Sequence, residues 1–233
     1  MAKKIKKKTK IKFIPILILI LLIIIVFFLV SFFMNVKIKN IYIYNNNLLS
    51  DQEIIELANL EDYPSFIKTN INKITKKLKT NQYIKDVKIK KSLIATISIT
   101  VLEYQPLFEY STTGKLVVDT NIELDNDDKI ISVPILVNYV PDTIYSQFIT
   151  EMKNVDEDIR SKISNIEYSP NDYDKKRFLL YMNDGNKVFV TLATENNKSR
   201  FSLINSYDEI YPTLGGKKGT LNLDSGNHFD IEG

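Results

Sequence analysis

The sequence predicts an α+β protein: an N-terminal transmembrane helix, a domain with the order β-α-α-β-β, and a second α+β domain with a mainly antiparallel sheet. The first observation is an apolar run, Phe13–Met34, that contains no charged residue. The second is the order of the patterns after it, in which the spacing of apolar residues changes from two to near 3.6 and back. The third is a series of short strand patterns with hairpin signals in the rest of the chain.

The apolar run is long enough to cross a membrane as one helix. Its 22 residues reach roughly 33 Å at about 1.5 Å each, and the hydrocarbon core of a bilayer is roughly 30 Å thick. A helix also satisfies its own backbone polar groups in lipid, and Pro15 falls in the first turn, where a missing N–H costs little. The alternative is a buried helix of a soluble core, but such helices rarely run this far without a polar face.

The charges beside the run predict its orientation. Seven lysines precede the run, whereas only Lys37 and Lys39 follow closely on the far side. The side with more positive charge stays in the cytoplasm. The N-terminus is therefore expected inside and everything after Met34 outside. A cleaved signal peptide is the alternative, but its apolar core is shorter and ends in a small-residue site, which residues 31–35 do not offer. The topology signal, which also touches anionic membrane lipid, consists of Lys3, Lys4, Lys6, Lys7, Lys8, Lys10 and Lys12.

Composition limits what the exported part can do. Without the seven lysines before the span, the chain has 24 basic and 28 acidic residues, a net charge of about −4. This argues against nucleic acid as a partner. The chain has no cysteine, so the exported part must fold without disulfides. It is long enough for one large domain or two small ones.

The first domain begins with a strand and a short helix. Residues 36–44 alternate apolar and polar side chains and are rich in β-branched and aromatic residues, which predicts a strand. Ser50 and Glu53 have the spacing of a capping box, in which each side chain bonds the other's backbone N–H. We expect the helix that follows to bury Ile54, Ile55 and Ala58.

A second helix and two strands complete this domain. Residues 70–79 place Ile71, Ile74 and Leu78 on one helical face and lysines on the other. Residues 87–91 and 96–102 then alternate with period two, which predicts two strands.

This order of elements behind a single anchor resembles the POTRA domain of the FtsQ/DivIB family of bacterial cell-division proteins. The resemblance continues downstream, through the segments 114–124, 133–136 and 183–188, and so covers nearly the whole chain. In the first domain it is carried by Ser50, Asn81, Ile84, Lys85, Val87, Ile89, Val101, Glu103 and Pro106.

The second domain reads as strands joined by two helical segments. Residues 183–186 (Asn-Asp-Gly-Asn) are a hairpin signal. The expected elements are a hairpin pair at 108–124, a helix at 142–163 with a break near Asn154, strands at 164–168, 178–182 and 187–192, a helix at 198–210, a flexible turn at 215–220 and a last strand at 220–223.

A search for catalytic chemistry finds no convincing site. The acidic run 125–128 lacks the glycine and closing glutamate of a calcium loop. A zinc site is not expected either, because the chain has no cysteine and His228 is its one histidine. Asp172 and Asp174 lie in a polar loop and read as solvated. Residues 215–220 lack the spacing of a phosphate loop. We therefore expect no enzyme, no cofactor, no metal and no small-molecule substrate.

The resemblance implies a divisome scaffold at the septum of the cell membrane. It implies binding to FtsL and to a DivIC/FtsB-type protein, and through them to the septal penicillin-binding protein. The alternatives are a POTRA-bearing component of a transport or envelope assembly system and, third, a membrane-anchored cell-wall enzyme. The expected segments are a cytoplasmic tail (1–12), the transmembrane anchor (13–34), the POTRA domain (35–106) and an FtsQ/DivIB-type β domain (107–233).

The last strand is the expected partner-binding surface. Because it comes last in the chain, we expect an open sheet edge, where a partner strand can add. In FtsQ-like proteins the final strand of this domain is the expected docking site for the FtsB/DivIC-type partner. The alternatives are that the strand only completes the sheet, or that binding occurs at the first POTRA strand near Ile41 and Ile43. The predicted residues are Gly219, Thr220, Leu221, Asn222, Leu223 and Asp224.

Overall fold

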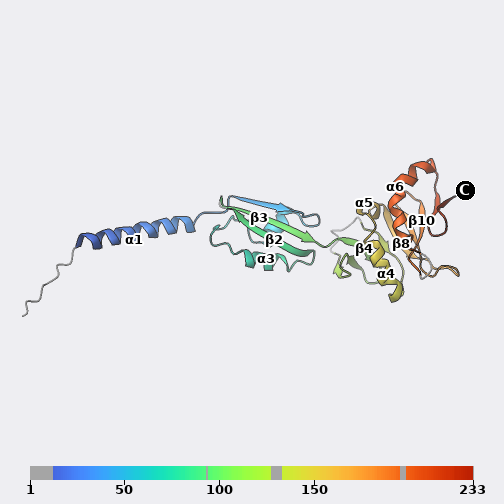
Figure 1. Cartoon of the computed structure of the whole chain (residues 1–233), viewed down its shortest axis with the longest axis horizontal. Helices are drawn as coiled ribbons and strands as arrows, with labels where there is room; N and C mark the ends of the chain where they lie inside the picture. Colours follow the sequence, from blue (N-terminus) through green and yellow to red (C-terminus); the bar gives the residue numbers. More distant parts are fainter. Residues whose placement is uncertain (1–12, 93, 127–132, 195–197, 233) are drawn as a thin grey trace, which may run out of the picture. The chain divides into compact units, whose positions relative to one another are not determined.

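The computed structural model describes residues 13–92, 94–126, 133–194 and 198–232. The chain divides into two compact units, Met1–Leu102 and Glu103–Gly233 (Figure 1). The predicted boundary after residue 106 lies a few residues further along, because Pro106 already begins the first strand of the second sheet.

The N-terminal helix α1, Phe13–Met34, has the predicted bounds, and none of its side chains is buried. Within the described residues it is the one helix long and apolar enough to cross a membrane. The seven lysines predicted to set its orientation lie outside the described residues.

The rest of the first unit is a three-stranded sheet with two helices. The sheet order is β1-β3-β2. Strands β1 and β3 run parallel, with Ile41 opposite Ile97 and Ile43 opposite Ile99. The elements are β1 Asn40–Tyr44, α2 Asp51–Leu57, α3 Ile71–Leu78, β2 Ile84–Ser92 and β3 Thr96–Glu103.

Both helices of this unit begin at a residue whose side chain caps the first turn. The Ser50 hydroxyl accepts the Glu53 N–H at 3.3 Å, and the Glu53 carboxylate accepts the Ser50 N–H at 2.9 Å, so the capping box is confirmed. Asn70 caps α3 by accepting the Lys73 N–H at 3.2 Å. The helices bury Ile54, Ala58, Ile74 and Leu78, whereas Ile55 and Ile71 are only half-buried.

The first strand starts later than predicted. It begins at Asn40 rather than residue 36, because the preceding backbone pairs with the loop before α3. Lys37 forms an isolated antiparallel bridge with Ser65, and the Ile38 N–H donates to the Pro64 carbonyl at 3.0 Å.

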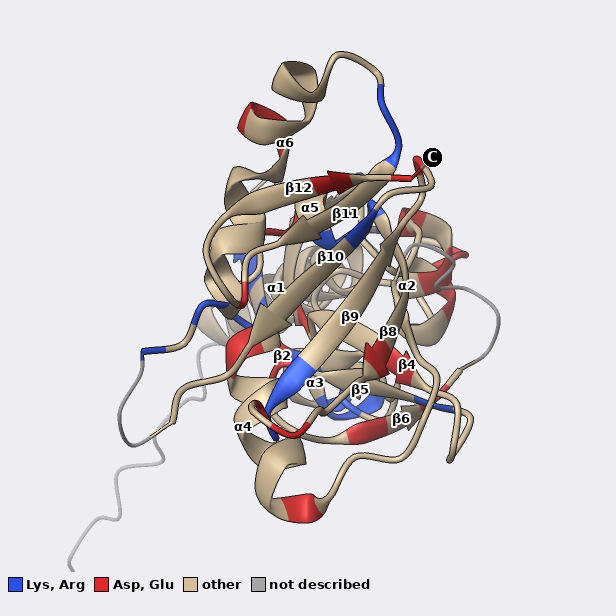
Figure 2. Cartoon of the chain, turned by 90° about the vertical axis from the view of Figure 1, so that its right-hand side faces the viewer, with Lys and Arg blue, Asp and Glu red and all other residues tan. Residues whose placement is uncertain are grey.

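The second unit contains a nine-stranded sheet in the order β12-β11-β10-β9-β8-β7-β4-β5-β6 (Figure 2). Its pairs are antiparallel except for β4–β7, β7–β8 and β10–β11, so the mainly antiparallel sheet is confirmed. The strands are β4 Pro106–Tyr110, β5 Lys115–Val118, β6 Glu123–Asp125, β7 Ile135–Leu136, β8 Ile163–Tyr168, β9 Arg177–Met182, β10 Lys187–Thr191, β11 Gly219–Asn222 and β12 His228–Ile231.

The helical segment predicted at 142–163 is shorter and divided. Helix α4, Asp142–Met152, is followed after a break by α5, Glu157–Arg160, and Ile163 already begins β8. The break near Asn154 is therefore confirmed and the end at 163 is wrong. Helix α4 carries Phe148 into an aromatic core, where its ring stacks on Phe178 at a centroid distance of 4.6 Å.

The prediction of one amphipathic helix at 198–210 is also wrong, because most of this segment forms 3₁₀ helix or lies outside any helix. The chain there forms 3₁₀ helix η1 Phe201–Ser206, a single turn α6 Tyr207–Ile210 and 3₁₀ helix η2 Tyr211–Leu214. The buried side chains are Phe201, Ile204 and Tyr207. A spacing of three aligns side chains in a 3₁₀ helix, which has about three residues per turn, so packing against the sheet favours this tighter form.

Candidate partner-binding surface

Strand β11, which contains most of the predicted docking segment, lies inside the sheet. It pairs in parallel with β10 on one side and antiparallel with β12 on the other (Figure 2). The expectation that this strand forms an open edge is therefore wrong. The tail after Asp224 turns back and supplies β12, which is the strand at this end of the sheet in the described part of the chain.

Burial agrees with this interior position. Gly219, Leu221, Asn222 and Leu223 are buried, and Thr220 and Asp224 are half-buried. Leu221 and Leu223 belong to the hydrophobic core. The backbone of β11 is thus occupied by its two neighbours, and its apolar side chains are occupied by the core.

Gly219 lets β12 approach β11 closely. A Cβ atom at this position would lie 2.1 Å from the carbonyl oxygen of Asp230 and 2.9 Å from the Phe229 ring. Real Cβ atoms do not come so close to backbone oxygen, so any side chain at position 219 must push the edge strand away. In the sequence this glycine reads only as the end of a turn.

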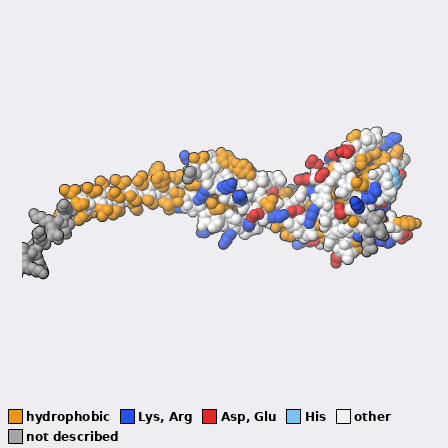
Figure 3. All heavy atoms as spheres, in the orientation of Figure 1, with side chains coloured by type: hydrophobic (Ala, Val, Ile, Leu, Met, Phe, Trp, Pro, Cys, Tyr) orange, Lys and Arg blue, Asp and Glu red, His pale blue; other side chains and the backbone are white. Residues whose placement is uncertain are grey.

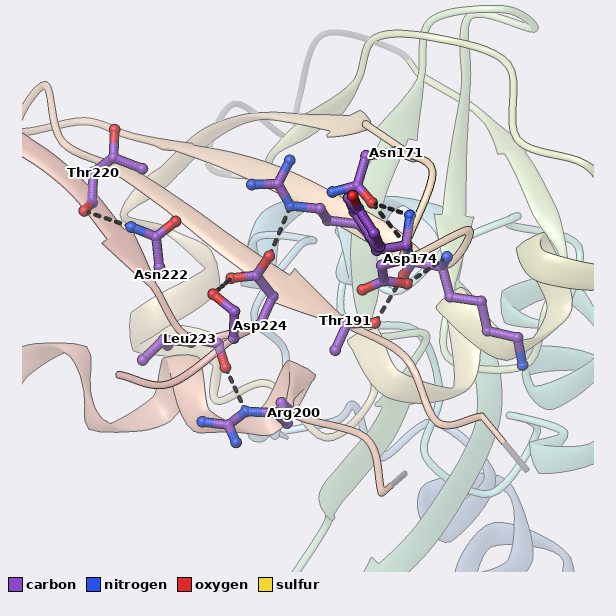
Figure 4. Close-up of polar contacts among 12 residues, drawn as sticks. Asn171, Asp174, Thr191, Arg200, Thr220, Asn222, Leu223 and Asp224 are labelled. Carbon is purple, nitrogen blue, oxygen red and sulfur yellow. Dashed lines mark hydrogen bonds and ion pairs between the residues drawn. The ribbon is translucent and has the colours of Figure 1, made fainter. Parts of the chain in front are cut away.

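Two arginines that the sequence did not mark as functional bind the end of β11, where Figure 4 labels Arg200, Leu223 and Asp224. Arg177 of β9 forms a largely buried ion pair with Asp224, with 2.7 Å between Nε and Oδ2, and its guanidinium lies 3.3 Å from the centroid of the Phe189 ring. Arg200 donates from Nε to the Leu223 carbonyl at 2.5 Å and from Nη2 to Asn227 at 2.5 Å. These bonds fix the turn that returns the chain into β12.

A polar network ties the start of β11 to the β9–β10 hairpin. Buried Asn186 accepts the Gly219 N–H at 3.0 Å and donates to the Tyr207 hydroxyl at 3.0 Å. That hydroxyl donates to Asp184 at 2.7 Å. Burial, followed by the bond to Asp184, raises the pKa of the Tyr207 phenol above its ordinary value. Residues 183–186 therefore form the predicted hairpin and also bind the start of β11 and the Tyr207 side chain.

Strand β12 offers the kind of edge that was expected of β11. The Glu232 N–H donates to the Lys218 carbonyl at 3.0 Å, toward β11. Since N–H groups alternate in direction along a strand, the Ile231 N–H points to the open side. The Ile231 side chain is 56% exposed, whereas Phe229 packs partly against the core. His228, which was weighed only as a zinc ligand, begins this strand.

Comparison with known proteins agrees with the fold. A family model described as the FtsQ-type POTRA domain matches residues 36–104. The cell division protein DivIB of Bacillus subtilis is 28% identical over 205 residues, 83% of this chain and 74% of that protein. DivIB of Listeria monocytogenes is 27% identical over 199 residues, 83% of this chain and 72% of that protein.

Residues 36–104 therefore match the FtsQ-type POTRA domain, and most of the chain is similar to DivIB proteins. A weaker likeness, with a TM-score of 0.36 and 18% identity, is to a solved extracytoplasmic domain of DivIB from Geobacillus stearothermophilus, over 49% of this chain and 92% of that one. Since these relatives are cell division proteins, similarity to them supports a role in division. With α1, it suggests a single-pass membrane protein.

The other segments that the sequence offered as candidate sites lie in exposed loops, in turns or at the end of a strand. The Asp172 side chain is fully exposed and lies 3.7 Å from Lys175, and Asp174 accepts the backbone N–H of Lys176. Gly215 and Gly216 have positive φ and form the turn after η2. Asp125 ends β6, while Asp127 and Asp128 lie outside the described residues.

Proposed function

We propose that this protein is a single-pass, non-catalytic scaffold of the cell-division machinery. The observation that carries the proposal is similarity to DivIB proteins over 83% of the chain. In this proposal α1 anchors the chain with residues 1–12 in the cytoplasm. The POTRA domain (35–106) and the β domain (107–233) stand outside, at the septum.

The partners in this proposal are the single-pass division proteins FtsL and a DivIC/FtsB-type protein. Through them the scaffold would recruit or regulate the septal penicillin-binding protein. Localisation tests this role: a fluorescent fusion should form mid-cell rings in dividing cells. A uniform envelope signal would contradict a septal scaffold and favour a general transport or assembly role.

Within this role we propose β12 as the docking strand for the DivIC/FtsB-type partner, in place of residues 219–224. Three features support it: β12 ends the described sheet, the Ile231 N–H faces outward, and the exposed Ile231 side chain can pack on an added strand. Strand addition draws affinity from backbone bonds and selectivity from alternate side chains.

Proline at position 231 tests this docking mode. Ile231→Pro removes one outward donor and leaves the inward bonds of Asp230 and Glu232 available. We expect it to abolish capture of the partner's extracellular segment while the domain stays folded. The expected result is loss of the partner in a pull-down with purified full-length protein.

Two control variants separate the backbone from the side chain. Ile231→Ala keeps the N–H, so it should weaken capture less than proline does. Asp230→Pro removes an inward donor and should loosen β12 itself, which hydrogen exchange would detect. Full capture by folded Ile231→Pro would exclude this edge and favour β1 of the POTRA domain. The variant Asn222→Pro is a poor test, because Asn222 is buried and donates to Asp230 at 2.8 Å.

A further inference from the structure

The loop before α3 is tied to the end of the membrane helix. Val36, two residues after α1, accepts the Phe66 N–H at 2.8 Å, and the Ser65 hydroxyl donates to the Met34 carbonyl at 2.6 Å. Two residues of extended chain span at most about 7 Å. If α1 crosses the bilayer, as the proposed function requires, residues 63–69 therefore lie at the surface of the leaflet where α1 emerges.

Exposed apolar side chains occupy this same loop. Tyr63 is 43% exposed and Ile67 is 48% exposed, and Phe66 between them is half-buried. Tyrosine is favoured at the membrane–water interface because one end of its side chain is apolar and the other is polar. The loop thus has the composition of a segment that enters the headgroup layer.

Lysines line a cleft next to the loop. The cleft has a volume of about 480 Å³ and includes Ser65, Lys68, Lys73 and Lys77 in its wall, with no acidic residue among the described residues that form it. Nearby, the Lys91 ammonium donates to the Phe66 and Thr69 carbonyls at 2.5 and 2.6 Å. The acidic pair Glu61 and Asp62 precedes the loop and is not part of the cleft wall.

The two units differ in charge in the same sense. Residues 35–102 contain 11 lysines and 6 acidic residues, whereas residues 103–233 contain 13 basic and 22 acidic residues. On the face shown in Figure 3, blue side chains gather on the unit after α1 and red side chains gather on the second unit. Of the two segments after α1, the one that joins the membrane helix therefore carries the excess of positive charge.

We propose that residues 63–69, which include Lys68, bind the phosphate headgroups of anionic lipids in the leaflet where α1 emerges, together with Lys73 and Lys77 of α3. The apolar side chains enter the interface and the ammonium groups pair with lipid phosphates. This contact holds the POTRA domain against the membrane, so α1 and the domain do not move independently. A soluble phosphate compound shares the chemistry but not the apolar contact.

The test uses the full chain in nanodiscs. Because the chain has no cysteine, Ile67→Cys provides a single site for an environment-sensitive fluorophore. Nanodiscs are prepared from phosphatidylcholine alone or mixed with phosphatidylglycerol, each with brominated acyl chains that quench an inserted fluorophore. We expect strong quenching in the anionic nanodiscs, weak quenching in the neutral ones, and release by high salt. Added glycerol phosphate should not release the loop.

A matched pair of charge reversals locates the site. Lys68→Glu with Lys73→Glu should lower the docked-to-free ratio at least roughly twentyfold, since each lysine near an anionic surface favours binding by roughly fivefold. Lys88→Glu with Lys90→Glu changes the net charge equally, at exposed positions on β2, and should leave quenching unchanged.

Three outcomes would overturn the proposal. Equal quenching in neutral and anionic nanodiscs would show that only the tether brings the loop to the surface. Equal loss in both double variants would show a general charge effect. Release by glycerol phosphate would show a site for soluble phosphate compounds. None of these results bears on mid-cell localisation, so the proposed division role is tested separately.

Discussion

Leu78 is one of the two buried side chains of α3, the helix that lies against β2 of the POTRA sheet. It is fully buried, as predicted, together with Ile97 and Ile99 of β3. Leu78→Ala should therefore reduce the free energy of unfolding by about 2–5 kcal/mol, because a buried leucine leaves a cavity when truncated. Urea unfolding of the fragment 36–106 measures this change. Lys76→Ala, at an exposed position of the same helix, should change it little, and a similar small change for Leu78→Ala would contradict the assigned helical face.

Arg160 shows how a single residue alters an element in a way that the sequence does not reveal. Its side chain is 2% exposed, and its guanidinium donates to the carbonyls of Met152 at 3.3 Å and Val155 at 2.8 Å. Burial lowers the pKa of this guanidinium, against the opposing effect of Glu157 and Asp156. The arginine thus satisfies carbonyls released at the end of α4, which a periodic apolar pattern continuing to residue 163 could not predict.

At the scale of elements, the sequence predicted those features that depend only on residues close together in the chain. The bounds of α1, the capping box at Ser50 and the hairpin around residues 183–186 each follow from neighbouring residues. The 3₁₀ form of η1 and the pairing of β12 depend on contacts with distant strands. The turn at 225–227 and the alternating pair Phe229 and Ile231 were the available signals for β12, but a short polar tail resembles a disordered end equally well.

Gly219 allows a direct test of how β12 is held. Gly219→Val should displace β12, since a Cβ atom there would lie 2.1 Å from the Asp230 carbonyl oxygen. Backbone amides of residues 228–231 should then exchange with solvent much faster in a hydrogen-exchange measurement, while β9 and β10 stay protected. Thr220→Val places the same residue at the next, half-buried position, where threonine already has a β-branched side chain of this size, and should not displace the strand. Unchanged protection in Gly219→Val would mean that the strands can shift apart without separating.

At the scale of the whole molecule, the segments have distinct compositions. The N-terminal tail has seven lysines before α1, the following domain carries an excess of lysine, and the last carries an excess of acid. The order of these segments was readable from the sequence because each is defined by composition or by a local pattern. The docking surface was not, since an edge strand is defined by what fails to pair with it.

Membrane topology provides the last prediction. The uncharged span and the lysines before it predict one crossing with the C-terminus outside. A C-terminal reporter that is active only in the cytoplasm should therefore stay inactive, and an active reporter would contradict the proposed orientation. Changing Lys3, Lys4, Lys6, Lys7, Lys8, Lys10 and Lys12 to glutamate removes the positive charge that is retained inside, so the population should become mixed and part of the reporter should gain activity. Reversing Lys37 and Lys39 instead, on the far side, strengthens the charge asymmetry and should leave the reporter inactive. Acidic residues affect orientation less than lysines do, so the loss of positive charge, rather than the gain of negative charge, is expected to cause most of the effect.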